Sequence, residues 1–407
     1  MSIRAKRGTR SQVDAAAAAN ELLVGELIFI SDEDVFAWAT ETNEYKVSGD
    51  IKAGDILITS RAVAPPQFIK ADNAQYLGSE YPLLAPLLPK ALEVTNITTG
   101  FSNNFLESIA TDNNGTWVCT ARAGEIRRST DDGLTWSSTS NASSSSAYYA
   151  TATDENGKWI TVGQGGNANV STDNGANWSN LNISGSEDFL GVATDKQGNW
   201  VVVGKMTGSF GTVRYSTNGG SSFSNGSVSN NHDINDVATD GSGVWITCGA
   251  QGRMMRSTNN GATWSTVSSG VFTELFGIAT NGSGIWLAVG GFGTAPPGVA
   301  TYSDDNGLTW TPITQEVGAL KKVATDASGV WLTIITNNAL RLNDSGIPVP
   351  PPSFSGNVNN LAASSNGVFI TVGNSNHMRR IAPPSPEEFI AESIGIEKAH
   401  YFTGEDT

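Results

Sequence analysis

The sequence predicts a mainly β protein built around a seven-bladed β-propeller with four-stranded blades, and three observations support this fold class. A motif of the form Ala-Thr-Asp-x-x-Gly-x-Trp occurs seven times, the last copy being the worn "AASSNGVF". The first Ala and the aromatic residue are seven residues apart in every copy, as in Ala110 and Trp117. A second motif, of the form Ser-x-Asp-x-Gly-x-x-Trp, follows each of the first five copies. A period of about 40 residues made of short strands is typical of one propeller blade per repeat.

Each first motif predicts two strands of a blade. The residues that follow the aromatic, such as "WITVG", "WVVVG" and "WLAVG", are apolar on both faces of a strand. Strands of this kind are covered on both sides, as in a blade packed between two neighbours. We place the recurring Ala on the innermost strand, where the chains crowd around the axis of the ring.

The second motif predicts the turn from the third strand to the fourth. Its Asp or Asn can bind backbone amides, its Gly can take a positive φ, and its aromatic then packs between strands. A calcium site is disfavoured, because the ligands are too few and Asn replaces Asp freely. The predicted structural residues are Ser129, Asp131, Gly133, Trp136, Ser171, Asp173, Gly175, Trp178, Ser257, Asn259, Gly261, Trp264, Ser303, Asp305, Gly307 and Trp310.

This motif is the Asp-box, or BNR, repeat, and residues 92–384 resemble Asp-box propellers such as sialidases and photosystem-assembly propellers. The resemblance implies the fold, but one propeller scaffold carries many activities. The last unit lacks a box strand. Counting back about 15 residues from Ala110, the spacing between other boxes and the next unit, leads to "LEVTNITT". Residues 92–99 are therefore predicted to complete the last blade and close the ring.

Two segments precede the propeller. Residues 1–50 contain Arg-Gly-Thr at 7–9, then "LLVGELIFISD" and a predicted hairpin that ends in "YKVSGD". They resemble the small β-rich attachment domain of phage tail-fibre and tropism-determinant proteins, although the usual "I-G-D-G" ending is here "VSGD". Residues 51–91, with "YLGSEYPLL" and a short helix capped by Ser79, resemble the linker before propellers in phage tail proteins.

A short C-terminal helix is predicted in residues 385–407. In "SPEEFIAESIGIEK", Ser385 fits a helix N-cap and Pro386 the first helical position. Phe389, Ile390 and Ile394 would share one side of this helix. That side would dock on the propeller itself or on a neighbouring subunit.

Composition excludes several classes of function. The chain has 407 residues, a net charge of −15 and a pI near 4.6, which disfavours nucleic-acid binding. No stretch approaches the ~18 apolar residues of a membrane span, and no signal peptide is recognised in the N-terminal residues. We therefore expect a protein synthesised in a cytoplasm. Cys119 and Cys248 lie three units apart, too distant to bond, and are expected to be free and buried.

The sequence predicts no catalytic, cofactor or metal site. His232, His377 and His400 are isolated, and HExxH, GxSxG and CxxC motifs are absent. A sialidase-like glycosidase would need an arginine cluster, yet the propeller's few arginines include Arg127, Arg128 and Arg256, which abut boxes. An acid pair for glycoside hydrolysis is left open by the carboxylates of Glu187, Asp188, Asp233, Asp236 and Glu274.

The predicted function is adhesion by a phage tail fibre or tail-tip protein. Its N-terminal region would anchor to other virion tail proteins, and its propeller would bind a host cell-surface receptor, a glycan or a protein. The tail-fibre resemblance implies a homotrimer. The alternatives are a structural tail component without receptor binding and a sialidase-like glycosidase.

Loop lengths predict that the receptor binds on the face opposite the boxes. The spacing from the second-strand Trp to the box Ser is 12 residues in units one, two and four, but 16 in unit three and 17 in unit five. Insertions are tolerated where recognition can use them. The receptor-binding candidates are Tyr148, Tyr149, Phe189, Phe210, Arg214, His232, Phe272 and Phe292.

Overall fold

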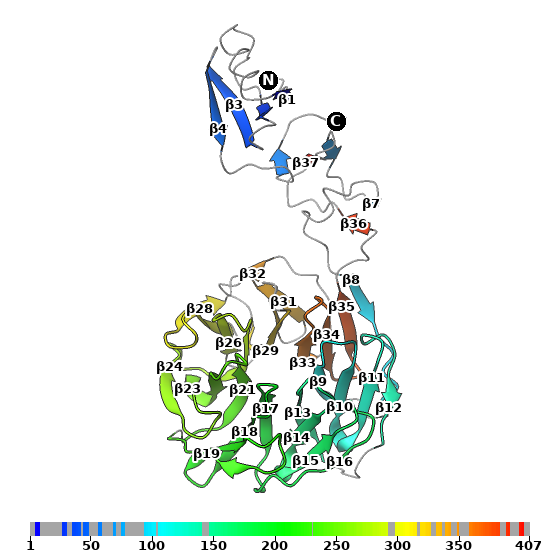
Figure 1. Cartoon of the computed structure of the whole chain (residues 1–407), viewed down its shortest axis with the longest axis vertical. Helices are drawn as coiled ribbons and strands as arrows, with labels where there is room; N and C mark the ends of the chain where they lie inside the picture. Colours follow the sequence, from blue (N-terminus) through cyan, green and yellow to red (C-terminus); the bar gives the residue numbers. More distant parts are fainter. Residues whose placement is uncertain are drawn as a thin grey trace. The chain divides into compact units, whose positions relative to one another are not determined.

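The computed structural model divides the chain into two compact units (Figure 1). The larger unit is Leu92–Ala382, and the smaller combines Met1–Ala91 with Pro383–Thr407. In the larger unit the structure describes residues 93–102, 105–140, 146–229, 231–291, 298–315, 318–326, 331–335, 338–342, 348–349 and 358–382. In the smaller unit it describes residues 5–8, 27–30, 35–41, 44–48, 56–58, 68–70, 75–77, 388–390 and 399–402.

The larger unit is a β-propeller, a ring of four-stranded antiparallel sheets (Figure 1). Among its described residues, six sheets consist of four consecutive strands, and a seventh combines β33, β34 and β35 with β8. The first strands of the sheets contact one another in the order β9, β13, β17, β21, β25, β29 and β33, and β33 contacts β9. The first strands therefore form the inner wall of a closed ring.

Four strands follow one another in each blade from the inner wall outward. The first three blades contain β9 (Leu106–Thr111), β10 (Trp117–Ala121), β11 (Ile126–Ser129) and β12 (Ser137–Ser138); β13 (Tyr148–Thr153), β14 (Trp159–Gly163), β15 (Ala168–Ser171) and β16 (Ser179–Asn180); and β17 (Phe189–Thr194), β18 (Trp200–Thr207), β19 (Phe210–Ser216) and β20 (Ser224–Asn225). The next two contain β21 (Ile234–Thr239), β22 (Trp245–Gly249), β23 (Arg253–Ser257) and β24 (Ser265–Ser268); and β25 (Leu275–Thr280), β26 (Trp286–Gly291), β27 (Gly298–Ser303) and β28 (Thr311–Gln315). The last two contain β29 (Leu320–Thr325), β30 (Trp331–Ile335), β31 (Asn338–Leu342) and β32 (Pro348–Val349); and β33 (Val358–Ala363), β34 (Phe369–Gly373), β35 (Met378–Ala382) and β8 (Glu93–Asn96).

Burial follows the predicted sequence pattern. The second strands β10, β14, β22 and β34 are buried along their whole length. The aromatic that begins the second strand is fully buried in every blade; these residues are Trp117, Trp159, Trp200, Trp245, Trp286, Trp331 and Phe369. A strand covered by a neighbouring blade on each side has no solvent face, which explains its uninterrupted apolar run.

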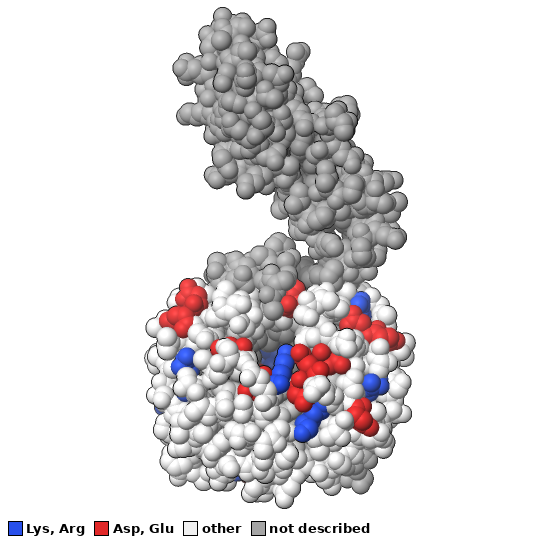
Figure 2. Space-filling model, in the orientation of Figure 1, with Lys and Arg blue, Asp and Glu red and all other residues white. Residues whose placement is uncertain are grey.

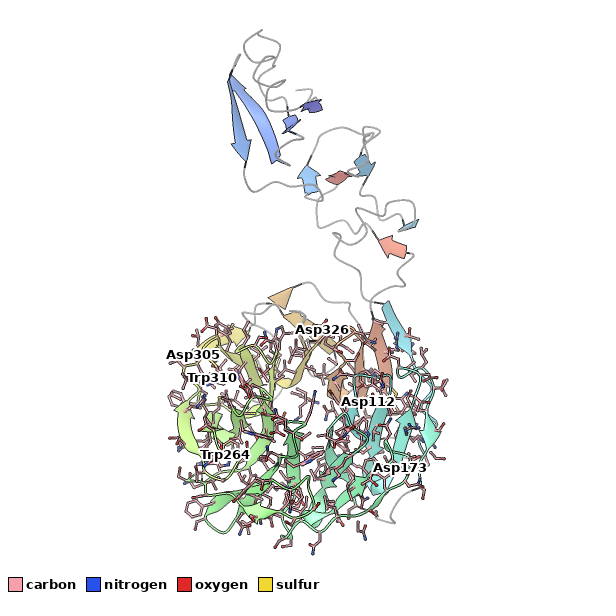
Figure 3. The ribbon with its side chains drawn as sticks, in the orientation of Figure 1. Asp112, Asp173, Trp264, Asp305, Trp310 and Asp326 are labelled. Atoms are coloured by element: carbon pink, nitrogen blue, oxygen red, sulfur yellow. The ribbon has the colours of Figure 1, made fainter. Side chains whose placement is uncertain are left out.

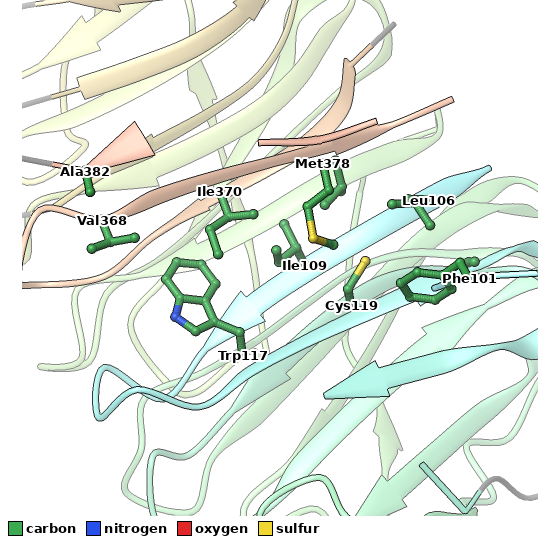
Figure 4. Close-up of a cluster of buried hydrophobic side chains, with 11 residues drawn as sticks. Phe101, Leu106, Ile109, Trp117, Cys119, Val368, Ile370, Met378 and Ala382 are labelled. Atoms are coloured by element: carbon green, nitrogen blue, oxygen red, sulfur yellow. The ribbon is translucent and has the colours of Figure 1, made fainter. Parts of the chain in front are cut away.

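The ring is closed by strand pairing between its two ends. Strand β8 pairs antiparallel with β35, with Val94 opposite Ile381 and Thr95 opposite Arg380. The prediction that residues 92–99 complete the last blade is thus confirmed. A buried cluster joins the last blade to the first, with Ile370 and Met378 packed near Leu106, Ile109 and Trp117 (Figure 4). The first and last residues of the propeller are therefore held together by both hydrogen bonds and apolar packing.

The box turns have the hydrogen bonds that the sequence predicts. In the first box, Ser129 Oγ donates to Asp131 Oδ1 at 2.7 Å and accepts from the Gly133 N–H at 3.0 Å. Asp131 Oδ1 also accepts from the Thr135 N–H at 2.9 Å, and the Trp136 indole donates to the Gly133 carbonyl at 3.1 Å. The same pattern occurs in boxes far apart around the ring, including those of Asp173 and Asp305 (Figure 3). These residues stabilise turns, as predicted.

The box glycine is required for two reasons. Its φ is positive in each described box, for example +82° at Gly133 and +77° at Gly307. A Cβ on Gly307 would lie only 2.0 Å from Cδ1 of Ile246, in the second strand of the preceding blade. Gly133 is equally close to Ile370, at 2.1 Å. The box turn of each such blade therefore packs directly on the blade before it.

Arginines next to the boxes link neighbouring blades. The Arg128 guanidinium donates to the Asn174 carbonyl of the next box at 2.6 Å, and Arg256 donates to that of Asn306 at 3.1 Å. Arg380 of the last blade donates to the Asp132 carbonyl of the first box at 2.9 Å. The predicted position of Arg128 and Arg256 on the structural face is confirmed.

The smaller unit contains three sheets in its described residues. One has the order β1 (Ala5–Gly8), β2 (Leu27–Ile30), β3 (Val35–Glu41) and β4 (Glu44–Ser48), with β1 and β2 parallel and β3 and β4 forming a hairpin. The second pairs β36 (Glu388–Ile390) with β7 (Gln75–Leu77). The third has the order β5 (Ile56–Ile58), β37 (Ala399–Phe402) and β6 (Phe68–Lys70).

The fold-class prediction was wrong about the C-terminal helix. The Glu388–Ile390 segment is a strand, with Phe389 opposite Tyr76. A helix of about 12 residues is marginal by itself, and residues such as Phe and Ile also favour strands when a partner strand is available. Ile394 and the helix predicted after Ser79 lie outside the described residues. No helix among the described residues has the length and hydropathy to cross a membrane.

Candidate functional site

The two faces of the propeller differ in regularity. On the box face, the turns between first and second strands are linked to the box turns, because the Trp117 indole donates to Asp132 Oδ1 at 3.0 Å and the Trp159 indole to Asn174 Oδ1 at 3.0 Å. The opposite face carries the loops between second and third strands and the loops that enter each blade. These loops differ from blade to blade in length and conformation. Variation is thus concentrated on one face, which is the common position for binding residues.

The first irregular feature is an extended hairpin in the third blade. Its long spacing produces a pairing between β18 and β19 that reaches Thr207 opposite Phe210. The corresponding loops of the first, second and fourth blades are short 3₁₀ turns, η1 (Arg122–Gly124), η2 (Gln164–Gly166) and η3 (Ala250–Gly252). Met206 is 45% exposed and Phe210 is 51% exposed. The hairpin therefore presents two apolar side chains to solvent.

The second irregular feature is a cavity in the fourth blade. Phe272 lies in the loop between β24 and β25 and is 92% exposed, the most exposed of the large hydrophobic side chains described. It lines a cavity of about 400 Å³ together with residues from η3, β23 and β24. The other lining residues are Gln251, Gly252, Arg253, Met254, Met255, Thr266, Val267, Ser268, Ser269 and Val271. This volume lies in the range of small-molecule sites, about 300–1,000 Å³.

The loop that carries Phe272 is fixed by buried hydrogen bonds. Ser269 Oγ donates to the Gly252 carbonyl at 2.7 Å and accepts from the Val271 N–H at 3.2 Å. Gly252 has a φ of +69°, and a Cβ there would lie 2.1 Å from the Val271 carbonyl oxygen. The main chain beside Phe272 is therefore held against η3 while the Phe272 ring is exposed.

The predicted receptor-binding residues fall into three groups. Tyr148 and Phe189 are fully buried, so they support the loops instead of offering a contact surface. Arg214 is bound within the protein, because its guanidinium donates to the Ser184 carbonyl and to Glu187. Phe210 and Phe272 are exposed, as the prediction requires.

Two further candidates, Tyr149 and His232, are half-buried. Burial, followed by the nearby carboxylates of Asp188 and Glu107, raises the pKa of the Tyr149 hydroxyl. The His232 Nδ1 atom is buried and has no hydrogen-bond partner in the described structure. Phe292 lies outside the described residues. The role of all eight candidates in receptor binding stays a prediction.

The carboxylates that were candidates for an acid pair each have a partner within the protein. Asp188 accepts from Lys205 at 2.7 Å and from the Gly165 N–H at 2.9 Å, and the bond from Lys205 lowers the pKa of its carboxyl. Asp233 accepts from the Met206 N–H at 2.7 Å, and Glu274 from the Asn235 amide at 3.0 Å. These bonds tie loops of one blade to the next. They give the carboxylates structural roles.

An ion pair crosses the inner wall of the ring. Lys322 Nζ of β29 lies 2.8 Å from Asp236 Oδ2 of β21, although β25 stands between these strands. Gly277 of β25 makes this reach feasible, because a Cβ there would lie 2.9 Å from the Lys322 Cα. In the view of Figure 2, acidic and basic side chains gather around the centre of the ring, and the visible outer wall is mostly uncharged.

Thiol and metal chemistry find no support in the described part of the chain. Cys119 and Cys248 are free and buried, as predicted, and burial is the main cause that raises the pKa of each thiol. No group of three or more His, Cys, Asp or Glu residues that would suit a metal ion occurs among the described residues. What the described loops offer is a surface for binding.

Sequence reasoning missed three residues of this surface. Met206 is exposed at the tip of the third-blade hairpin, and Gln251 and Arg253 line the fourth-blade cavity. The alignment of repeats contains a signal for the last two. Gln251 takes the place of Ala123 and Gly165, and Arg253 that of Glu125 and Asn167, in the otherwise similar loops of the first and second blades.

Comparisons with known proteins support the fold. The BNR/Asp-box repeat family model matches residues 301–312. A structure of YCF48 bound to D1 peptide is similar, with 12% identity, a TM-score of 0.55 and coverage of 72% of this chain and 96% of that chain. YCF48 from Cyanidioschyzon merolae has 14% identity, a TM-score of 0.54 and coverage of 71% and 99%. The structure of U3-55K has 9% identity, a TM-score of 0.60 and coverage of 71% and 98%.

The comparisons are limited to architecture. No curated protein matches the sequence. At identities this low, a shared propeller shows the fold alone, because one scaffold carries many functions. The match to the box repeat is compatible with a sialidase-like propeller and equally with a binding module.

Proposed function

We propose that the chain is a phage tail fibre or tail-tip protein whose propeller binds a glycan on the host surface. The observation that carries the proposal is the contrast between the two faces of the ring. One face is a series of hydrogen-bonded turns, and the other presents exposed aromatic side chains beside a cavity. Exposed aromatic rings with neighbouring polar groups suit sugars, which have both apolar faces and hydroxyl groups.

The N-terminal residues support the phage assignment through their resemblance to tail-fibre attachment domains. In this proposal they anchor the chain to other virion tail proteins, and three copies assemble as the resemblance implies. The likeness to YCF48 adds a limited argument. One YCF48 structure is described as bound to D1 peptide, so a ring of this shape serves as a binding module in another protein.

Glycoside hydrolysis is the weaker alternative. An acid pair needs one carboxyl group free to protonate the leaving group and a second free to act as base or nucleophile. The carboxylates of Asp188, Asp233, Asp236 and Glu274 are instead held by lysines, an asparagine amide or backbone N–H groups. These bonds favour a binding role over a catalytic one.

The test compares substitutions on the two faces in the full chain. One variant carries Phe210→Ala and Phe272→Ala, and its control carries Leu134→Ala and Leu308→Ala, which remove exposed leucines from box turns. Each fluorescently labelled protein is incubated with a panel of bacterial cells and their purified surface polysaccharides. We expect the control to bind like the parent chain and the Phe210/Phe272 variant to lose at least about tenfold in affinity, which is 1.4 kcal/mol.

Three outcomes would contradict the proposal. Loss of binding in the leucine variant alone would place the receptor on the box face. Absence of binding by the parent chain to every cell and polysaccharide would favour a purely structural tail component. Release of reducing ends from a bound polysaccharide would show a glycosidase.

A further inference from the structure

We propose that the fourth-blade cavity binds a saccharide that carries a carboxylate, such as a hexuronic acid residue. The inference rests on the proposed function and specifies its ligand class. The binding groups are the ring of Phe272, the guanidinium of Arg253 and the side-chain amide of Gln251, all of which line the cavity.

The charge of the cavity selects an anion. Arg253 is the one charged residue among those that line it. Its side chain is exposed, and no described residue forms an ion pair with its guanidinium. In a chain with a net charge of −15, an unpaired arginine in a cavity without acids is a local exception. A guanidinium presents paired N–H donors that match the two oxygens of a carboxylate.

Comparison with the other blades shows that this arginine is not needed for the turn. At the equivalent position of the first blade, Glu125 accepts hydrogen bonds from Ser102 and Arg127. At that of the second blade, the Asn167 amide donates to the Gln164 carbonyl at 2.7 Å. Both side chains stabilise their own blade. Arg253 has no comparable partner in the described structure, so its donors are left for a ligand.

Gln251 leads to the same conclusion from the backbone. It has a φ of +55°, a conformation that L residues adopt at a cost. The equivalent positions carry the small residues Ala123 and Gly165, with φ of +61° and +65°. A longer side chain gives no advantage to such a turn. Its exposed amide does give the cavity one acceptor and two donors for sugar hydroxyl groups.

Phe272 supplies the apolar contact that distinguishes a sugar from a simple anion. Its ring is 92% exposed, although its main chain is fixed by the Ser269 hydrogen bonds. An aromatic ring held in place beside hydrogen-bonding groups loses little conformational entropy on binding. The equivalent loop positions in the third and fourth blades are the exposed polar residues Ser186 and Asn231. The aromatic is therefore specific to this cavity.

Methionine methyl signals provide a direct test in the full chain. The chain has five methionines, and Met254 and Met255 are buried at the wall of the cavity, while Met378 lies in the core of the last blade. We label the methionine methyl groups with ¹³C and titrate methyl glucuronide, its neutral counterpart methyl glucoside, and N-acetylglutamate amide at millimolar concentrations. The expected result is a saturable shift of the Met254 and Met255 signals with glucuronide and no shift of Met378.

Variants separate the contributions of the residues. Methyl glucoside should bind at least about tenfold more weakly than glucuronide, and Arg253→Gln should abolish this difference. Phe272→Ala should weaken both sugars, while the control Lys205→Gln, in the neighbouring blade, should weaken neither. The inference is overturned if glucuronide leaves Met254 and Met255 unshifted, if the two sugars bind equally to the parent chain, or if N-acetylglutamate amide binds as well as glucuronide. If the labelled chain still binds cells in any of these cases, the proposed function survives and the ligand assignment fails.

Discussion

Replacing Gly307 by Ala should destabilise the propeller far more than the same change at a glycine of similar φ that packs on nothing. Gly307 is the box glycine of the fifth blade, with a φ of +77°. A methyl group there would lie 2.0 Å from Cδ1 of Ile246, which is fully buried in the fourth blade. The substitution therefore combines backbone strain with a steric clash between blades.

The size of the effect follows from these two contributions. A left-handed conformation costs an L residue about 1–2 kcal/mol. Forcing an extra methyl group into a close-packed interface costs about 1–3 kcal/mol. Gly307→Ala should therefore lower the free energy of unfolding by about 2–5 kcal/mol. For a domain of this size, that corresponds to about 4–10 °C in melting temperature.

A matched control and a compensating change isolate the clash. Gly282 has a φ of +73°, and the nearest atom to an added Cβ is 4.0 Å away, so Gly282→Ala carries the strain alone. Other blades place Glu155 and Lys196 at this position with positive φ. Ile246→Val removes the Cδ1 atom that the new methyl group would meet. It costs about 0.5–1.5 kcal/mol in the parent chain, but it should raise the stability of the Gly307→Ala variant.

The assay is thermal unfolding of the full chain by calorimetry for the four variants and the parent. The expected order of melting temperature places Gly307→Ala lowest, the Gly307→Ala/Ile246→Val double variant above it, and Gly282→Ala nearer the parent. Equal melting temperatures for Gly307→Ala and Gly282→Ala would falsify the inference that box glycines are required by packing between blades. A double variant less stable than Gly307→Ala would do the same, because the clash would then contribute nothing.

Three further predictions concern pH and ring closure. Bonds from Asn177 to Asp173, and from Thr309 to Asp305, lower the pKa of each carboxyl to about 2; because unfolded Asp has a pKa near 3.9, this stabilisation should be complete above about pH 4 and lost towards pH 2, and Asn at both positions should flatten the acid limb of the stability profile. Burial, followed by the charge of Arg379, lowers the pKa of His377 to about 4; the unfolded chain binds this proton near pH 6.5, so stability should fall as pH drops from about 6.5 to 4, and a His377→Gln variant whose unfolding retains the full pH dependence in that range would refute the assignment. A chain that begins at Phe101 lacks β8, and we expect it to aggregate or to melt well below a chain that begins at Pro89, whereas equal melting temperatures would show that β8 does not hold the ring closed.

The C-terminal segment and the loop aromatics show where sequence reasoning fails. A local pattern of Ser, Pro and Glu before apolar residues favours a helix at Ser385, but Glu388–Ile390 pairs with a strand more than 300 residues earlier in the chain. Tyr148 and Phe189 were candidates for an exposed surface, yet both are fully buried. Each begins a first strand whose register shifts by one residue at the next position. A shift of one residue moves a side chain to the other face of a strand, and no local pattern in the sequence marks it.

The sequence by itself determined the features that depend on neighbours a few residues apart or on the repeat. Ser129, Asp131, Gly133 and Trp136 specify the box turn because all of its hydrogen bonds lie within seven residues. The strand order within blades and the return of residues 92–99 to the last blade followed from spacing alone. Only the tertiary structure decided which polar groups are left for a ligand. Arg214 is bound to Glu187, 27 residues away, while Arg253 has no described partner, and the two arginines look alike in sequence. Availability depends on what the neighbouring loops place within hydrogen-bonding distance, which is a property of the packed ring.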